Sequence, residues 1–599
     1  MPSGRMPGCF GTGCTLAVLG YVLAATAAPA PADTVYRNGN VYTVDAKNSV
    51  QQALAVRSGT IVFVGSDVAA QAFIGPQTTV HDLQGGMLMP GLVDGHMHPL
   101  MGGRTLLKCN LNYARLTVTE MQARIQECLD ASKDREPDGW LEVVNWFQEA
   151  MRGGTETSRA TLDALRTQRP ILVMSSFGHT ALVNTRGLAL SGITAATPDP
   201  PGGKIERDPS GQPTGLLQDA GFGRAVAAIP KSTAVDDINA AEAALDALRA
   251  QGVTTFLDAA ASEETLAAFA GAEKRGKLTA RAHFAVLIKP TEGQDPKQAV
   301  ARVKELARRY DEGPIGSQPH LTVRNIKLFL DGVITAPACT GAMIAPYFVN
   351  QGSPDRPHWV AGANRGPAVY FPAPILKAVI LEAAAAGFEP HMHTDGDRAV
   401  REGLDAIETL RQKFPPQVIR AALAHDEIVD PADFPRYGVL DAIPVLSFQW
   451  EKPAPDTVDG AQDYLGPTRY PYIEPAAFLA DAGARTAFGS DWPVDPLDEW
   501  FALKVAVTRT NAPEAESKYR GRLGRDRGLS RRAMLRAATL NSSYELHQDD
   551  RTGSLEVGKL ADLIILDRNV LEIPAEQIAN VKVLQTIVGG RVVYDAARH

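Results

Sequence analysis

A short apolar segment that ends in His-x-His constrains this chain more than any other feature of its sequence. The segment runs from Pro90 to His98 and reads PGLVDGHMH. Along a β-strand, residues i and i+2 point to the same side, so the side chains of His96 and His98 are presented together. Two imidazoles on one side suit a single metal ion. The alternative is a pair of surface histidines. The chain has only 12 histidines, however, and two of them lie at one strand end, which favours metal binding.

The segment from residue 90 to 547 alternates apolar strands with helices rich in alanine, leucine and glutamate. Repeated strand–helix units predict a parallel sheet with helical crossovers, in the α/β class. A TIM (β/α)8 barrel and a doubly wound sheet share this pattern. The length of the segment and its histidines favour the barrel, whose functional site lies at the carboxyl ends of the strands. The expected strands are Ile171–Ser175, Thr254–Leu257, Ala282–Leu287, Ile326–Phe329, Phe388–His393, Ala422–Ala424 and Thr486–Phe488.

The two ends of the chain are rich in short strands and tight turns. Turn signals at Asn38-Gly39, Ser58-Gly59 and Gly589-Gly590 predict hairpins. Because the termini of a domain often lie close together, we expect residues 33–89 and 548–599 to form one small composite β-sandwich. Within the barrel segment, the polar and turn-rich stretch Gly202–Gly215 predicts an inserted hairpin.

The first 32 residues are typical of a secretory signal peptide. Arg5 precedes the apolar run Thr15–Ala25, and Ala25-Thr26-Ala27 is a small-x-small cleavage pattern. The run is too short to cross a bilayer, for which about 20 apolar residues are needed. We therefore expect a periplasmic or secreted protein with no membrane partner after cleavage. In an oxidising compartment Cys109 and Cys128 could form a disulfide.

The charge of the chain indicates little about macromolecular partners. The formal net charge is −8 over 599 residues. So mild a charge gives no reason to expect a nucleic acid, and we expect a small-molecule substrate. The oligomeric state stays open, a homodimer included.

Three further candidate ligands lie at the ends of predicted strands: His393, His425 and Asp491. Together with His96 and His98 they make a nitrogen-and-carboxylate set that suits a borderline metal ion. His391 competes with His393, since the two share a strand face. We favour His393 because it lies nearer the strand end.

Lys327 lies in the apolar strand Asn325–Phe329, where a charged ammonium is costly. One interpretation is a salt bridge to Asp331, four residues on. The other is a carboxylated lysine, because burial favours the neutral amine that reacts with CO₂. The carbamate would then bridge two metal ions.

These residues resemble the amidohydrolase superfamily, and more closely its amidohydrolase 3 branch, which includes N-substituted formamide deformylases. The matching segments cover nearly the whole mature chain: PGLVDGHMH, GHTALVNTRGLAL, GQPTGLLQDA, IKLFLDGV, HTDGDRAV, FGSDWPV and GSLEVGKLADLIILD. The resemblance implies a metal-bearing TIM barrel with a composite β-sandwich, and hydrolysis of amide or related C–N bonds. The metal centre that it implies is His96, His98, Lys327, His393, His425 and Asp491, with His179 and Asn184 lining the substrate pocket.

Three positions depart from the pattern of this branch. Asp219, a candidate substrate-binding residue, stands where glutamate is usual, and the shorter carboxylate changes its reach toward a metal. HTDGD, from His393 to Asp397, replaces the commoner HAIGD. Phe177 stands where a polar residue is frequent. These departures bear on the metal count and the substrate rather than on the fold.

The expected reaction is hydrolysis of a non-peptide amide or formamide. One or two zinc ions would activate a water, with Lys327 and His425 beside it, and Asp491 would act as general base and then general acid. Arg104 could hold an anionic group of the substrate, although arginine is more often simply exposed. Two alternatives remain: a hydrolase of esters, lactones or carbamates on the same centre, and a binding protein on a disabled barrel.

Overall fold

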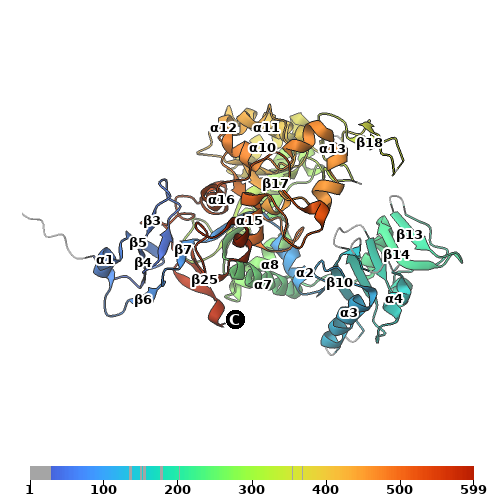
Figure 1. The fold of residues 1–599 in the computed structure, drawn as a ribbon, viewed down its shortest axis with the longest axis horizontal. Coiled ribbons are helices and arrows are strands. Elements are labelled where there is room, and N and C mark those ends of the chain that lie inside the picture. Colours follow the sequence, from blue (N-terminus) through green and yellow to red (C-terminus); the bar gives the residue numbers. More distant parts are fainter. Residues whose placement is uncertain are drawn as a thin grey trace, which may run out of the picture.

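The computed structural model describes residues 29–598 except 134–137, 149–150, 153–156, 176–179, 201–202, 337, 354 and 367–368. Nearly all of the predicted signal peptide, residues 1–28, lies outside the described residues. Three units follow one another across the molecule: a β-sandwich, a central barrel and an inserted sheet module (Figure 1). Among the described helices, none is long and apolar enough to cross a membrane.

The central unit is the predicted TIM barrel, built from eight strands that pair in parallel with their neighbours. In order around the barrel they are β8 (Leu92–Met97), β15 (Val253–Ala261), β16 (Arg281–Leu287), β17 (Leu321–Phe329), β20 (Glu389–Thr394), β21 (Ala421–His425), β22 (Ala442–Leu446) and β23 (Ala487–Phe488). Strands covered on both faces read as nearly continuous apolar runs, as β15 and β16 do.

The first and last strands meet just beyond the end of β23. The backbone N–H of Asp491 donates to the carbonyl of His96 at 2.7 Å, and that of His98 donates to the carbonyl of Trp492 at 2.7 Å. A Cβ at Gly489 would lie only 2.4 Å from the Cβ of His96, so this approach requires glycine. The closure therefore brings the loop after β23 onto the His-x-His end of β8.

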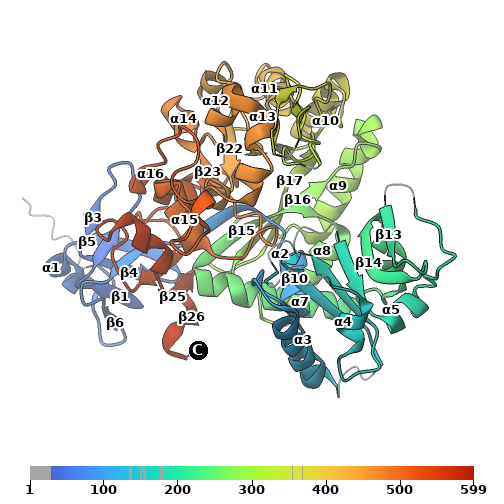
Figure 2. The same ribbon diagram turned by 45° about the vertical axis from the view of Figure 1, so that its right-hand side comes forward.

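Helices surround the barrel and bury their apolar faces against it (Figure 2). The principal ones are α2 (Pro99–Leu106), α7 (Ala234–Gln251), α8 (Glu263–Lys274), α9 (Pro296–Tyr310), α10 (Ala373–Ala385), α11 (Asp397–Arg411), α12 (Phe434–Leu440) and α15 (Glu499–Thr508). Helix α7 shows why such segments form: Thr233 and Asp236 make a capping box, and Gly252 ends the helix in the left-handed region at φ 89°.

The segment between α2 and α7 folds into a separate module. A six-stranded sheet, in the order β13-β14-β12-β11-β10-β9, packs with helices α3 (Val118–Ser132), α4 (Arg159–Asp163) and α5 (Thr185–Leu190). Its strands are β9 (Cys109–Asn110), β10 (Leu141–Trp146), β11 (Ile171–Ser175), β12 (Thr180–Val183), β13 (Gly203–Arg207) and β14 (Pro213–Asp219). The predicted hairpin is the β13–β14 pair, and the predicted Cys109–Cys128 disulfide is present.

Two strand predictions need correction. Ile171–Ser175 is a strand, but it belongs to the inserted module rather than to the barrel. The prediction failed because β10, α4 and β11 form a parallel strand–helix–strand unit, whose sequence pattern is the same as that of a barrel unit. Strand β22 was not expected, since Pro444 within it is unusual for a central strand.

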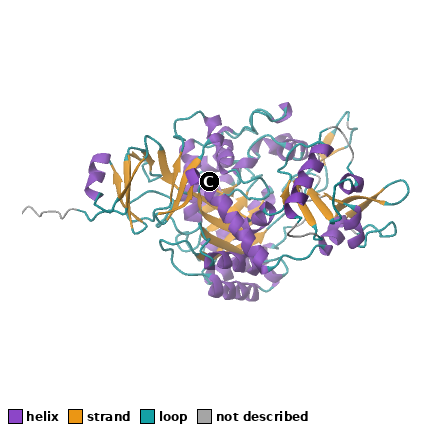
Figure 3. Ribbon diagram, turned by 90° about the horizontal axis from the view of Figure 1, so that it is seen from below, coloured by secondary structure: helices purple, strands orange, loops and turns teal. Residues whose placement is uncertain are grey.

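The chain ends form the composite sandwich as predicted. Figure 3 shows the strands of the molecule in orange. One sheet has the order β5 (Thr60–Gly65), β4 (Ala53–Arg57), β1 (Thr34–Arg37), β6 (Thr79–Asp82). The other has the order β26 (Arg591–Asp595), β25 (Val583–Val588), β24 (Leu563–Leu566), β7 (Met87–Pro90), β2 (Asn40–Tyr42), β3 (Val50–Gln51).

The two chain ends share this second sheet, because β24 pairs antiparallel with β7. The hairpins at Ser58-Gly59 and Gly589-Gly590 are confirmed. The one predicted at Asn38-Gly39 is wrong, because β1 and β2 pair within different sheets.

Candidate metal centre

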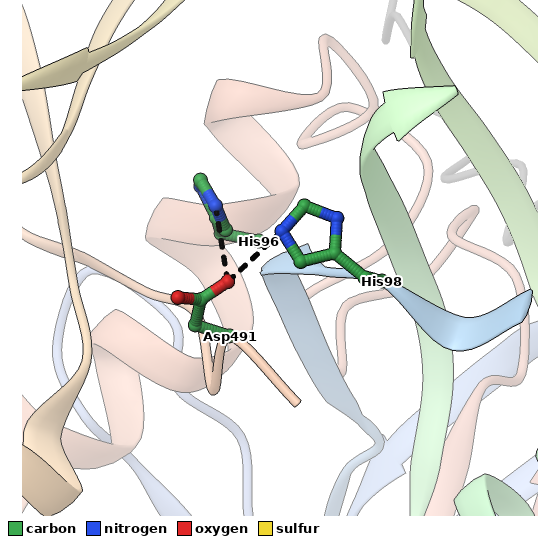
Figure 4. A group of neighbouring side chains, drawn as sticks. All are labelled: His96, His98 and Asp491. Carbon is green, nitrogen blue, oxygen red and sulfur yellow. Dashed lines mark ion pairs between the residues drawn. The ribbon is translucent and has the colours of Figure 1, made fainter. Parts of the chain in front are cut away.

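His96, His98 and Asp491 lie together at the carboxyl ends of β8 and β23 (Figure 4). Oδ1 of Asp491 is 3.4 Å from Nε2 of His96 and 3.1 Å from Nε2 of His98. The His96 side chain is 2% exposed, whereas that of His98 is 18% exposed, so solvent reaches this group from the side of His98. Asp491 holds φ 53°, a left-handed conformation that aspartate tolerates better than most residues.

A second group consists of His393, at the end of β20, His425, the last residue of β21, and Asp395. One ligand atom of each lies within 4.8 Å of the others. The ring centroid of His425 is 4.7 Å from that of His393 and 4.5 Å from that of His96, so the two groups adjoin. Asp395 was not a predicted site residue, although the HTDGD segment that carries it departs from the family pattern.

Lys327, on β17, is fully buried between strands, and its Nζ lies 3.4 Å from Nε2 of His96. The salt bridge to Asp331 that the sequence allowed is not formed among the described residues. Asp331 instead accepts hydrogen bonds from the backbone N–H groups of Ala342, Asp395 and Gly396. Burial lowers the pKa of Lys327 from 10.5 to about 7, against the opposing charges of Asp491 and Asp395.

His391 lies behind the first group rather than in it. Its Nε2 is 2.7 Å from Nδ1 of His96, and its Nδ1 is 3.0 Å from Oε1 of the buried Glu545. Strand register explains this: β20 pairs His391 with Lys327 and His393 with Phe329, so His391 sits one layer deeper in the barrel. His393, and not His391, lies in the second candidate group, and its preference as a ligand stays a prediction.

Burial keeps the imidazoles of His96, His393 and His425 neutral. It lowers the pKa of His96 and His425 well below 6.5, and that of His393 to about 3. Burial raises the pKa of Asp491, but the hydrogen bond from His98 and the adjacent His425 outweigh it, so the pKa ends below 3.8. Neutral imidazoles and an ionised carboxylate are the states in which these side chains bind metal.

One acidic residue near this centre was missed by the sequence reasoning. Asp258, near the end of β15, is buried, and burial raises its pKa to about 6 while the nearby His98 lowers it. Its only sequence signal is its position near the end of a predicted barrel strand.

Two predicted substrate residues are not brought to the centre. The side chain of Asn184 is used within the inserted module: Oδ1 accepts from the N–H groups of Ile171 and Gly187, and Nδ2 donates to the carbonyl of Arg169. Arg104 points to α7 and pairs with Asp237 at 2.7 Å. Both side chains hold elements together rather than reaching toward the metal groups.

Two further predicted site residues, His179 and Asp219, are not placed at the metal centre by the described part of the structure. His179 and Phe177 lie outside the described residues. The backbone of Asp219 ends β14, where it pairs with Gly203 of β13.

A cavity of about 340 Å³ lies between α2, α7, the inserted module and the loop after Asp491. Tyr113, Asn145 and Trp492 are among its lining residues.

Comparison with known proteins agrees with this architecture. The profile of the "Amidohydrolase family" matches residues 79–594. The protein LONG AFTER FAR-RED 3 of Arabidopsis thaliana is 27% identical over 94% of this chain and 92% of its own length. The N-substituted formamide deformylase of Arthrobacter pascens is 25% identical over 94% of this chain and 98% of its own length.

A solved structure has the same fold: an uncharacterized metal-dependent hydrolase from Pyrococcus horikoshii, with a TM-score of 0.69 and 22% identity over 90% of this chain and 99% of that one. The family match spans most of the chain, including every residue of the two candidate metal groups. The chain therefore belongs to the amidohydrolase family and is a hydrolase of that family.

Proposed function

We propose that this protein is a zinc-dependent amidohydrolase that cleaves the C–N bond of a small amide or formamide. The observation that carries the proposal is the group of His96, His98 and Asp491, which converge at the strand ends of the barrel. Two imidazole nitrogens and a carboxylate oxygen are ligands that zinc prefers, and three protein ligands leave one position open for water or substrate. The relative from Arthrobacter pascens, a formamide deformylase by name, supports this substrate class.

A zinc ion bound by this group would act as a Lewis acid and lower the pKa of a bound water to about 7. Asp491 would accept the proton of the attacking water and deliver it to the departing nitrogen. That delivery matters because an amide anion is a very poor leaving group, whereas an amine leaves readily. His425, whose ring lies 4.5 Å from that of His96, faces the same centre and would border the carbonyl.

Lys327 is proposed to be carboxylated. Its neutral amine would add to CO₂ and lose a proton, leaving a carbamate whose two oxygens could bridge two metal ions. Full burial and a pKa lowered to about 7 support the neutral amine. We further propose export of the protein by the sequence of residues 1–32, followed by action in the periplasm or outside the cell.

The test is a substrate panel with the zinc-loaded protein: N-substituted formamides, N-acyl amines, and the ester of each acyl group. We expect turnover of at least one C–N substrate. The Asp491→Asn variant should keep metal but lose kcat by roughly 10²–10⁴, and lose more on the amide than on the ester, since only the amide needs a strong general acid.

The matched control is Asp498→Asn, which removes a carboxylate seven residues away. Asp498 caps α15 by accepting from the N–H of Phe501, and asparagine caps equally well, so kcat should not change. If the zinc-loaded protein hydrolyses esters but no C–N substrate, the proposal is wrong and the protein is an esterase. A normal kcat for Asp491→Asn would remove Asp491 from the mechanism.

A further inference from the structure

We propose that the cavity between the barrel and the inserted module binds an uncharged sugar, and that its occupancy is coupled to the first metal group through the chain from Asp491 to Pro493. The inference goes beyond the proposed function, because the site that it assigns is not the place of the reaction. No side chain of the two candidate metal groups is among the described residues that line this cavity. Only the coupling rests on the proposed binding of zinc.

The cavity has the size and the position of a small-molecule site. Its volume is about 340 Å³, and it is enclosed by α2, the last turn of α7, the inserted module and the loop after Asp491. Pockets for small molecules start at roughly 300 Å³ and lie preferentially at the boundary between two folding units. The cavity therefore has room for one sugar between the barrel and the module.

The lining of the cavity is polar but uncharged. Among the described residues that form it, there is no lysine, arginine, histidine, aspartate or glutamate. Its polar side chains are amides and hydroxyls: Thr105, Asn110, Asn112, Tyr113, Asn145 and Gln251. An ionised ligand would leave water here without an opposite charge to meet it, which is costly. An amide both donates and accepts hydrogen bonds, so this lining suits the hydroxyl and amide groups of a neutral ligand.

Part of this amide network is left over for a ligand. Oδ1 of Asn110 accepts from the backbone N–H of Asn112 at 2.8 Å and from Nδ2 of Asn145 at 3.0 Å. Within the described part of the chain, Nδ2 of Asn110, Oδ1 of Asn145 and the side-chain amide of Gln251 form no hydrogen bond. The two asparagines thus hold each other in place, and each keeps one group for a ligand.

The backbone beside the cavity is held in an uncommon conformation. Asn112, Tyr113 and Asn145 have φ values of 54°, 55° and 56°, in the left-handed region that few residues other than glycine adopt. Strand β10 also shifts its register against β11 between Val143 and Trp146, and this bulge carries Asn145. Bulges turn a side chain to a new direction, and strained residues cluster at functional sites. Three such residues on one cavity indicate a binding site rather than a packing defect.

Trp492 supplies a flat apolar wall. A Cβ at Gly102 of α2 would lie only 2.4 Å from the indole ring, so the ring packs directly on the helix backbone. Leu106 and Leu497 also line the cavity. A sugar ring has apolar C–H groups on its faces and hydroxyl groups around its rim. The indole therefore matches a face of the sugar, and the amides match the rim.

The chain segment that lines the cavity also holds the first metal group. The N–H of Asp491 donates to the carbonyl of His96, and the carbonyl of Trp492 accepts from the N–H of His98, each at 2.7 Å. Trp492 and Pro493 line the cavity directly. A sugar packed against these two residues would fix the segment that positions the Asp491 carboxylate. We expect it to favour the conformation that binds zinc, so that the two ligands bind with positive coupling.

The experiment is isothermal titration calorimetry of the purified protein with N-acetylglucosamine, in zinc-loaded and in chelator-treated form. Glucosamine, as its cation, and glucuronate are the matched probes, because they keep the ring and add a charge. We expect N-acetylglucosamine to bind at one site per chain, and each charged sugar to bind at least about tenfold more weakly. Zinc should tighten the sugar Kd at least about fivefold, and the sugar should tighten the zinc Kd by the same factor.

Two variants locate the binding in this cavity. Ala247→Phe fills it from α7 and should abolish binding of the sugar. Ala243→Phe is the matched control: it lies one turn earlier on the same helix, is partly buried as Ala247 is, and does not line the cavity. Gln251→Leu removes an amide at nearly constant size and should weaken the sugar about tenfold. The zinc Kd measured without sugar should stay at the wild-type value in all three variants.

Three results overturn the inference. The first is a wild-type protein that binds N-acetylglucosamine no better than the two charged sugars. The second is wild-type affinity for this sugar in Ala247→Phe, which would place the binding elsewhere. The third is an equal sugar Kd with and without zinc, which contradicts the coupling. The titration of the chelator-treated protein involves neither zinc nor hydrolysis, so a failure of the sugar site is distinguishable from a failure of the proposed function.

Discussion

His96 has two buried side chains behind it, His391 and Glu545. Oε1 of Glu545 lies 3.0 Å from Nδ1 of His391. Nε2 of His391 lies 2.7 Å from Nδ1 of His96, so the deeper ring supports the nitrogen of His96 that faces away from Asp491. Nε2 of His96 faces Asp491 and is the nitrogen placed to bind metal.

We predict that Glu545→Gln weakens zinc binding at the first site by about 10–100-fold, the usual cost of losing a group that supports a metal ligand. Competition with a fluorescent chelator measures the Kd. Glu389→Gln is the control, because the buried Glu389 also pairs with a histidine, the partly exposed His547, at 2.8 Å, and that histidine belongs to neither candidate metal group. Equal zinc Kd values for Glu545→Gln and the wild type would show that His96 needs no such support.

At the scale of single residues, the spacing of the histidines and the positions of strand ends were enough to predict one candidate metal group. His-x-His and the position of Asp491 after an apolar strand were sufficient to bring three residues together, and the structure has them in one group. Asp395 and Glu545 were not foreseen. Their roles depend on which side chains stand behind a strand or beyond its end, and one sequence does not specify that register.

At the scale of elements, the barrel and the sandwich are joined by a buried ion pair. Arg281, at the start of β16, donates from Nε to Oδ2 of Asp562 at 2.6 Å and from a terminal nitrogen to Oδ1 at 3.0 Å. The two side chains are 1% and 3% exposed. Asp562 precedes β24 and also accepts from the N–H of Gly589, so this pair connects a barrel strand to two strands of the sandwich.

We predict that Arg281→Met destabilises the protein by about 3–5 kcal/mol, because it leaves the Asp562 carboxylate buried and unpaired. The double variant Arg281→Met/Asp562→Leu should regain part of this loss, since neither charge remains. Chemical denaturation provides the measurement. Arg308→Met is the control: its partner Glu305 is exposed, and such pairs contribute little. Equal stability of Arg281→Met and Arg308→Met would contradict the assigned role.

The sequence predicted most elements but could not assign them all to a unit. All seven strands expected between residues 90 and 547 are present, but one of them, Ile171–Ser175, belongs to the inserted sheet. A strand–helix–strand pattern is local, whereas membership of a barrel depends on pairing between segments distant in the chain. The sandwich was predictable because its two halves are the two chain ends.

At the scale of the whole molecule, the inserted module borders the catalytic side of the barrel. The Tyr113 hydroxyl of this module donates to the carbonyl of Pro493, two residues after Asp491, at 3.4 Å. The cavity of about 340 Å³ lies along the same boundary. The barrel thus provides the metal ligands, and the module contacts the loop that carries Asp491.

The most direct test of the central claim is anomalous scattering at the zinc edge from crystals of the zinc-loaded wild-type protein. We predict two peaks, one within coordination distance of His96, His98 and Asp491, and one within coordination distance of His393, Asp395 and His425. Each peak should lie about 2.0–2.2 Å from its nitrogen and oxygen ligands. Zinc-loaded crystals with no peak at either group would contradict the claim that these side chains form the metal centre of the enzyme.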